Sequence, residues 1–236
     1  MDDATHLTIL DRGHELSGVV RPGESWRGAA RRTCASLHVE PTALDLSGDV
    51  KRFVIDHDRK VALRAMTRAD LTDVVRWRSA EHVRRWWPSA EAPTLDHLTR
   101  HYGARIDGTG STRMWVAEVN GRSVGFCQDY RIRDHPDFAV LAPDPDAVGV
   151  DYVVGEPHLV GAGVGTALLW AWMISARRRY RDVSTYFAAP DHRNAPSLRV
   201  LAKVGFVAGT WFDEPQADGE VGTMVGCSLD VADVVG

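Results

Sequence analysis

Hydrophobic and polar residues alternate along two stretches near the middle of the chain, a pattern that predicts half-buried β-strands. These stretches, residues 114–119 and 122–132, flank Asn120-Gly121, the dipeptide that most strongly favours a two-residue hairpin turn. The sequence therefore predicts a central β-hairpin. Turn residues also bound several further runs that we expect to be strands. These runs are residues 61–66, 148–155, 182–189, 207–215 and 222–231.

Apolar residues at helical spacing predict two helices after the first of these strands. The first helix covers residues 71–77 and follows a capping box, in which Thr67 and Asp70 exchange hydrogen bonds with the backbone. The second helix covers residues 79–87 and is expected to end before Pro88, because proline does not continue a helix.

Two further helices are predicted in the second half of the chain. One follows Gly165 and runs to the basic cluster 177–179, which suits the negative end of a helix dipole. The other has Asn194 as its N-cap, carries Pro196 in its first turn and ends before Gly205. This order of strands and helices predicts an α+β fold, with one mixed central β-sheet flanked by helices.

The first 60 residues have a different pattern. Short β-like runs at residues 6–10, 15–20, 35–39 and 52–57 are separated by Gly, Pro and Asp turn signals. We expect residues 1–60 to form a small β-rich N-terminal appendage without chemistry of its own, and residues 61–236 to form the main domain. An edge strand of the appendage could pair with a second chain, so a homodimer is one assembly to consider.

Composition narrows the class of protein. A chain of 236 residues, 44% hydrophobic and 25% charged, is typical of a globular protein. Its net charge of −4 gives no general reason to expect nucleic acid as a partner. Cys34, Cys127 and Cys227 lie far apart, which predicts reduced thiols and no metal site. No signal peptide or membrane span is apparent, so we expect a cytoplasmic protein without membrane partners.

Three glycines, Gly161, Gly163 and Gly165, stand at every second position before an apolar helix. Each one costs about 0.5–1 kcal/mol of conformational entropy relative to alanine, which a ligand approaching the backbone would offset. A P-loop would need a lysine here, and Thr166 stands where a dinucleotide fingerprint needs its third glycine. Two interpretations remain. In the first, the turn binds the pyrophosphate of coenzyme A through free amides and the helix dipole, and in the second, the glycines merely permit tight packing.

Residues 61–232 resemble the GNAT superfamily of acetyl-CoA-dependent N-acetyltransferases. The strand "VGVDYVVG", the turn "LVGAGVGT" and the segment "NAPSLRVLAKVGF" carry the resemblance. Within the superfamily, "EHVRRWW", "APTLDHLTRHY" and "GFCQDY" are most similar to the aminoglycoside 6′-N-acetyltransferases, with siderophore-type lysine acyltransferases a near second. The resemblance implies acetyl-CoA as cosubstrate and a small polycationic amine as acceptor.

Asp151 is the candidate general base for such a reaction. Side chains alternate along a strand, so Asp151 shares a face with Gly149 and Val153 in an otherwise apolar run. A carboxylate there is unfavourable unless it is partnered or functional, and a structural salt bridge is the alternative. The resemblance further implies that the amide of Val153 or Val154 donates to the thioester oxygen.

The remaining assignments complete the expected site. Residues expected to bind acetyl-CoA are Val153, Val154, Val160, Gly161, Ala162, Gly163, Val164, Gly165, Thr166 and Asn194. The resemblance implies that the residues in contact with the acceptor are Trp87, Gln128, Tyr130, Asp137 and Asp151. Two acidic rims suit a polycation, and they comprise Asp134, Asp137, Asp144 and Asp146 with Asp213, Glu214, Asp218 and Glu220. For each rim, a merely solvated charged loop remains the alternative.

Two positions depart from the family pattern. Val160 stands where many members carry Arg or Gln, but the amide and not the side chain faces the pyrophosphate, so this departure matters little. Leu201 stands where many members carry a tyrosine that protonates the leaving thiolate. Two other functions stay open, namely acylation of a different amine, such as a siderophore precursor or a polyamine, and a catalytically silent acyl-CoA-binding module. Leu201 favours the silent module, whereas Asp151 opposes it.

Overall fold

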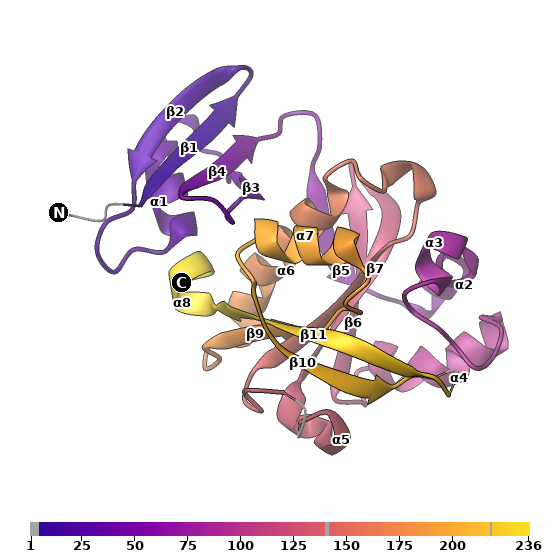
Figure 1. Cartoon of the computed structure of the whole chain (residues 1–236). Helices are drawn as coiled ribbons and strands as arrows, with labels where there is room; N and C mark the ends of the chain where they lie inside the picture. The colour runs from indigo at the N-terminus through magenta and orange to yellow at the C-terminus, as the bar shows by residue number, and fades with distance from the viewer. Residues whose placement is uncertain (1–4, 140–141, 218) are drawn as a thin grey trace.

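The computed structural model describes residues 5–139, 142–217 and 219–236. Seven strands of these residues form one sheet in the order β10-β11-β9-β8-β7-β6-β5 (Figure 1). Their bounds are β5 (Val61–Ala65), β6 (Thr112–Val119), β7 (Arg122–Arg131), β8 (Val148–Val154), β9 (Thr185–Ala188), β10 (Val207–Pro215) and β11 (Val221–Asp230). Within this sheet β8 and β9 run parallel, and the other neighbours are antiparallel.

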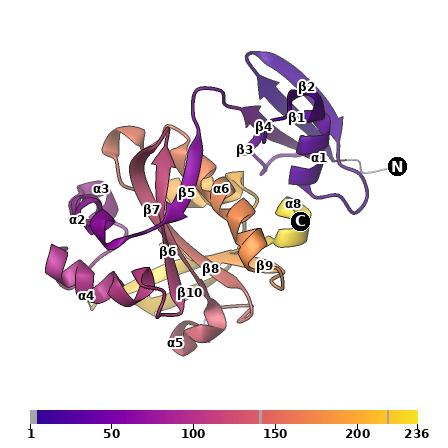
Figure 2. The same cartoon turned by 180° about the vertical axis from the view of Figure 1, so that it is seen from behind.

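Helices cover both faces of the sheet (Figures 1 and 2). On one face α2, α3 and α4 pack over Phe126 and Val153, and on the other face α6 packs over Cys127 and Val150. The helix bounds are α2 (Leu71–Ser79), α3 (Glu81–Arg84), α4 (Leu95–Ile106), α5 (Pro136–Ala139), α6 (Val164–Arg179), α7 (Ala195–Lys203) and α8 (Val231–Val235). The expected α+β architecture, a mixed sheet flanked by helices, is confirmed.

Local signals in the sequence identified several element ends correctly. Asn120 and Gly121 take φ values of +52° and +77° in the tight turn between β6 and β7. Thr67 and Asp70 form the expected capping box ahead of α2. Asn194 caps α7 by accepting a hydrogen bond of 3.2 Å from the amide of Ser197.

Helix α4 was not among the predicted elements. The signal for it was present, because Thr94 caps the helix and the apolar residues Leu98 and Tyr102 that it buries are four positions apart. The predicted helix over residues 79–87 is shorter than expected and ends at Arg84. Both differences lie in the region between α2 and β6.

The N-terminal residues form a second, four-stranded sheet in the order β2-β1-β4-β3. Its elements are β1 (His6–Asp11), β2 (His14–Val19), α1 (Trp26–Thr33), β3 (Thr42–Asp45) and β4 (Val50–Ile55). The expectation of a β-run at residues 35–39 was wrong. Residues Ala35–Leu37 form a 3-10 turn that continues the reversal after α1, and His38 ends the turn in the left-handed conformation.

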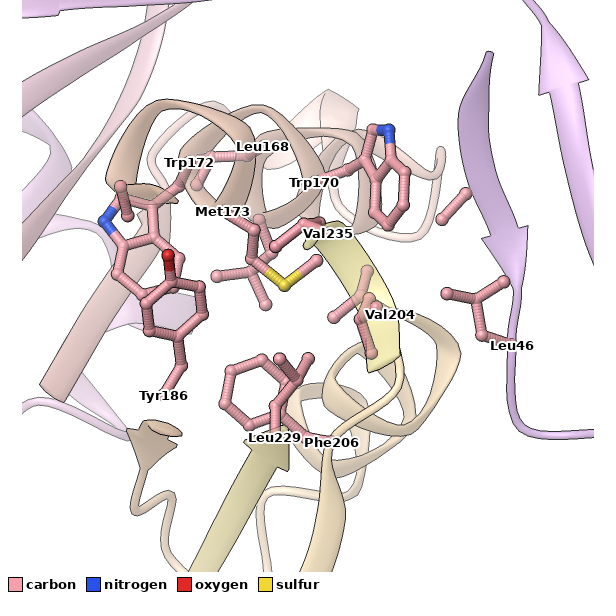
Figure 3. Close-up of a cluster of buried hydrophobic side chains, with 14 of the residues drawn as sticks. Leu46, Leu168, Trp170, Trp172, Met173, Tyr186, Val204, Phe206, Leu229 and Val235 are labelled. Atoms are coloured by element: carbon pink, nitrogen blue, oxygen red, sulfur yellow. The ribbon is translucent and has the colours of Figure 1, made fainter. Parts of the chain in front are cut away.

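This N-terminal sheet packs against α6 and α7, and its buried residues join one continuous core with theirs. The ring of Phe53 lies 5.7 Å, edge to face, from that of Trp170, whose indole N–H donates to the carbonyl of Pro41 at 3.0 Å. The amide of Leu46 donates to the carbonyl of Lys203 at 2.8 Å. Figure 3 shows Leu46 and Trp170 on the side of the core that meets the N-terminal sheet. A boundary between two domains at residue 60 stays a prediction.

A buried carboxylate, Asp129 of β7, organises the core behind the sheet. It is fully buried and accepts hydrogen bonds from the indoles of Trp115 and Trp172 at 2.8 and 2.9 Å. Arg179 and the hydroxyl of Tyr180 donate to it at 2.6 and 2.7 Å. These four donors supply the polar partners that a buried charge requires.

Among the described residues, no helix combines the length and apolar character needed to cross a membrane. The three cysteines are buried and unpaired, as expected from their spacing. Burial raises the pKa of the Cys127 thiol well above its usual range, which makes it an inert packing residue.

Candidate active site

A cleft of about 1060 Å³ opens where β8 and β9 diverge. Strand β8 pairs with β7 along its whole length, but with β9 only at Val148 and Gly149. The edge of β8 from Val150 to Val154 therefore lines the cleft, together with parts of α3, α7, β10 and the turn before α6. An extended ligand could pair with this open edge as an added strand would.

The backbone of β8 determines which amide faces the cleft. A Cβ on Gly125 of β7 would lie 2.1 Å from the carbonyl oxygen of Val153, so this carbonyl points toward β7. Successive peptide groups of a strand point to opposite sides, so the amide and carbonyl of Val154 face the open edge. His82 of α3 places its Nε2 atom 3.0 Å from that carbonyl oxygen. Of the two amides proposed for the thioester oxygen, that of Val154 is the accessible one.

The turn before α6 presents free backbone N–H groups. Gly161 and Gly163 both have φ values of +80°, a conformation that disfavours any side chain. Helix α6 begins at Val164 without a side-chain cap. Within the part of the chain that the structure describes, five amides of this segment meet no protein acceptor. They belong to Gly161, Gly163, Val164, Gly165 and Thr166.

Those amides, at the positive end of a 16-residue helix, form a site suited to an anion such as a phosphate. The amides of Val160 and Ala162 differ, because they donate to the carbonyls of Pro157 and Leu159 within the turn. Only the N–H groups that have no acceptor within the turn are therefore available to bind a ligand.

Asp151 lies on the opposite face of β8 from α6, the face that it shares with Val153. Its carboxylate accepts a hydrogen bond of 2.7 Å from the side-chain amide of Gln128, whose own oxygen accepts one of 2.7 Å from Arg105 of α4. Burial raises the pKa of Asp151, while Gln128 and Arg105 oppose that rise. Asp151 is thus a partly desolvated carboxylate in fixed orientation, and none of the described residues forms a direct ion pair with it.

A second carboxylate, Glu214 of β10, faces the same part of the cleft. Burial and the negative charge of Asp151 raise the pKa of Glu214. Tyr130 and Trp87 also line this part, and the ring of Trp87 lies 5.5 Å from that of Phe126. Two carboxylates, a phenol and an aromatic surface are groups that can hold a cationic, ring-containing amine.

Most residues expected from the sequence meet in this cleft. Its lining includes Trp87, Gln128, Tyr130, Asp151, Val153, Val154, Val160, Gly161, Gly163, Gly165, Thr166 and Asn194. Ala162, Val164 and Asp137 are not among the lining residues. Val164 is buried, and Asp137 is exposed on α5. Of the two acidic rims, Glu214 lines the cleft, whereas Asp146 pairs with Arg133 and Asp218 lies outside the described residues.

Two contributors were missed by sequence reasoning. Arg105 reaches Gln128 from α4, a helix that was not predicted, and His82 reaches the backbone of β8 from α3. Among the described residues, no cluster of three or more His, Cys, Asp or Glu side chains could hold a metal ion.

Comparison with known proteins agrees with this geometry. The family described as acetyltransferase (GNAT) domain matches residues 66–214. The chain belongs to the GNAT acetyltransferase family. Two aminoglycoside N(6')-acetyltransferases of type 1, from Klebsiella pneumoniae and Serratia marcescens, are each 28% identical to it over 156 residues. That alignment spans 65% of this GNAT acetyltransferase and 77% of each relative.

Solved structures of an aminoglycoside acetyltransferase, AAC(6')-Ib, share the fold of this GNAT acetyltransferase. The complex with coenzyme A superposes with a TM-score of 0.62 at 25% identity, over 72% of this chain and 95% of the other. The complex with paromomycin and acetyl-CoA gives a TM-score of 0.63 at 25% identity, over 72% and 93% of the two chains.

Proposed function

We propose that this GNAT N-acetyltransferase transfers the acetyl group of acetyl-CoA to a primary amine of a small polycationic acceptor, with an aminoglycoside as the first candidate. The observation that carries the proposal is the cleft itself. At one end the cleft has the free amides of the turn, and the open edge of β8 runs along its length. Asp151 also lines the cleft, from the face of β8 that points away from α6.

In this proposal the diphosphate of acetyl-CoA binds the turn, where Gly161, Gly163 and the first residues of α6 offer N–H groups. The pantetheine arm follows the open edge of β8, and Asn194 at the start of α7 contacts it. The amide of Val154 then donates to the thioester oxygen and stabilises the negative charge that develops there during attack.

Asp151 acts as the general base, and accepts the proton that the attacking amine loses. The amine nitrogen bonds to the acetyl carbon, the carbon–sulfur bond breaks, and its electron pair stays on sulfur. A raised carboxyl pKa improves the match between the base and the working pH, and Gln128 with Arg105 fixes its orientation.

The tyrosine that protonates the leaving thiolate in many family members has no counterpart at position 201, because Leu201 carries no proton to give. Burial raises the pKa of the Tyr152 hydroxyl still further above that of a thiol. A thiol has a pKa of about 8.5, so the sulfur can depart as an anion and take its proton from solvent.

Selection of the acceptor depends on charge. Asp151 and Glu214 each can meet one ammonium group, and Trp87 offers a flat surface for a ring. Curated relatives are named as aminoglycoside N(6')-acetyltransferases, and AAC(6')-Ib has been solved with paromomycin and with ribostamycin. Those names support an aminoglycoside as the first acceptor to test.

Thiol release from acetyl-CoA, measured with a panel of aminoglycosides, polyamines and hydroxylysine-type amines, tests the proposal. We expect release with an aminoglycoside and a much lower rate with amines of single charge. Release with another amine alone would replace the acceptor but keep the activity. Acetyl-CoA binding without release for any acceptor would instead indicate a silent acyl-CoA-binding module.

A further inference from the structure

The N-terminal segment lies outside the region that matches the GNAT family, yet it reaches the turn before α6. Arg59, between β4 and β5, donates from Nη1 to the carbonyl oxygen of Ala162 at 2.5 Å. The same nitrogen lies 3.6 Å from the position that a Cβ on Gly163 would occupy. Asp56 holds this stretch of chain by accepting hydrogen bonds from the amides of Asp58 and Arg59 at 3.1 and 2.9 Å.

The bond from Arg59 fixes one particular peptide group. The carbonyl of Ala162 and the N–H of Gly163 belong to the same planar trans peptide, so they point in opposite directions. When Arg59 holds the oxygen on its own side, the N–H of Gly163 is directed away from Arg59. Gly163 lines the cleft, and its amide is one of those that meet no acceptor among the described residues.

The glycine on one side of this peptide gives the contact something to fix. Rotation of the peptide between Ala162 and Gly163 changes ψ of Ala162 and φ of Gly163, and a glycine restricts φ less than any other residue. A rotated peptide would present a carbonyl oxygen, which repels phosphate, where an N–H had been.

We propose that Arg59 is a positioning residue for acetyl-CoA, supplied by the N-terminal segment, which holds the Ala162–Gly163 peptide with its N–H toward the diphosphate. The guanidinium also places a positive charge beside the turn, partly offset by the carboxylate of Asp56, which lies 3.6 Å from Nε of Arg59. This inference rests on the proposed function, because it assigns the diphosphate to that turn. It gives the N-terminal sheet a role, since its packing on α6 and α7 sets where Arg59 lies.

The test compares two acetyl donors that differ in the diphosphate. With Arg59→Gln, KM for acetyl-CoA should rise about tenfold, the effect of losing one charged hydrogen bond. The kcat value at saturating acetyl-CoA, and kcat/KM for S-acetylpantetheine, which lacks the diphosphate, should stay unchanged. Arg59→Lys, which keeps the charge and a donor, should recover part of the affinity. Arg52→Gln, an exposed site on β4, is the matched control.

An equal loss with both donors, at unchanged thermal stability, would overturn the inference, because the diphosphate would then not be involved. Unchanged kinetics with both donors would overturn it as well. Failure of the proposed function is distinguishable, since the unaltered protein would then release no thiol from either donor.

Discussion

Replacing Asp151 with asparagine removes the proposed base with little change in shape. The nitrogen of Gln128 that donates to the carboxylate at 2.7 Å can donate equally to an asparagine oxygen, so Gln128 and Arg105 keep their places. What is lost is the capacity to accept a proton. General-base catalysis contributes about 100- to 10,000-fold, so kcat/KM should fall by a factor in that range.

The same substitution should leave the fold intact or stabilise it. Burial raises the pKa of Asp151, so the folded protein binds this proton more tightly than the unfolded chain does. The resulting stability is present below the ordinary pKa of an Asp carboxyl and is lost as pH rises through the raised value. An asparagine stays neutral at every pH, so the variant does not lose this stability as the pH rises. The variant should therefore unfold at the same temperature as the unaltered protein at pH 7, or at a higher one.

The assay is thiol release from acetyl-CoA at several pH values, with calorimetry on both proteins. In the unaltered protein kcat/KM should rise with pH through one ionisation, and Asp151→Asn should lack this rise. Asp233→Asn, at an exposed site on α8, serves as the control and should behave as the unaltered protein. Turnover of Asp151→Asn equal to that of the unaltered protein would refute the assignment of the base.

Three further predictions concern the core, the turn and the acceptor. Asp129→Asn leaves the charge of Arg179 without its buried carboxylate partner and should lower the free energy of unfolding by about 3–5 kcal/mol. Denaturant unfolding measures this change, and an unchanged free energy of unfolding would contradict the network. Gly163→Ala places a side chain at a φ of +80° and should therefore raise KM for acetyl-CoA. Gly165→Ala should not raise it, because its Cβ would lie at an ordinary contact distance of 3.5 Å from its nearest neighbour. Equal effects of the two substitutions on KM would contradict the role of the turn. Glu214→Gln removes a negative charge near Asp151, so it should raise KM for dicationic acceptors and shift the acid limb of the pH profile to lower pH; an upward shift would refute that coupling.

Sequence reasoning found the features that depend on near neighbours. The capping box, the Asn120-Gly121 turn, the cap at Asn194 and the alternation along β8 are all written within a few residues. The choice of face for Asp151 follows from the same alternation, because it needs only the strand itself.

Features that depend on contacts between distant elements were not predictable in this way. Arg105 joins Gln128 across 23 positions, and Arg59 reaches Ala162 across 103. Which of Val153 and Val154 offers its amide depends on pairing with Gly125, which only the assembled sheet defines. Composition alone leaves each acidic rim either solvated or facing a ligand, whereas the position of the hairpin in the fold brings Glu214 to the cleft.

The carboxylate of Asp129 couples the packing of the core on one face of the sheet to the position of cleft residues on the other face. Its immediate neighbours Gln128 and Tyr130 point into the cleft, while Asp129 itself is tied to Trp115 and Trp172 behind them. A shift in those two indoles would move the strand and carry both cleft residues with it. Acceptor preference could therefore be retuned by repacking tryptophans that no substrate ever touches, which makes the hidden side of the sheet a reasonable place to seek variants with altered selectivity.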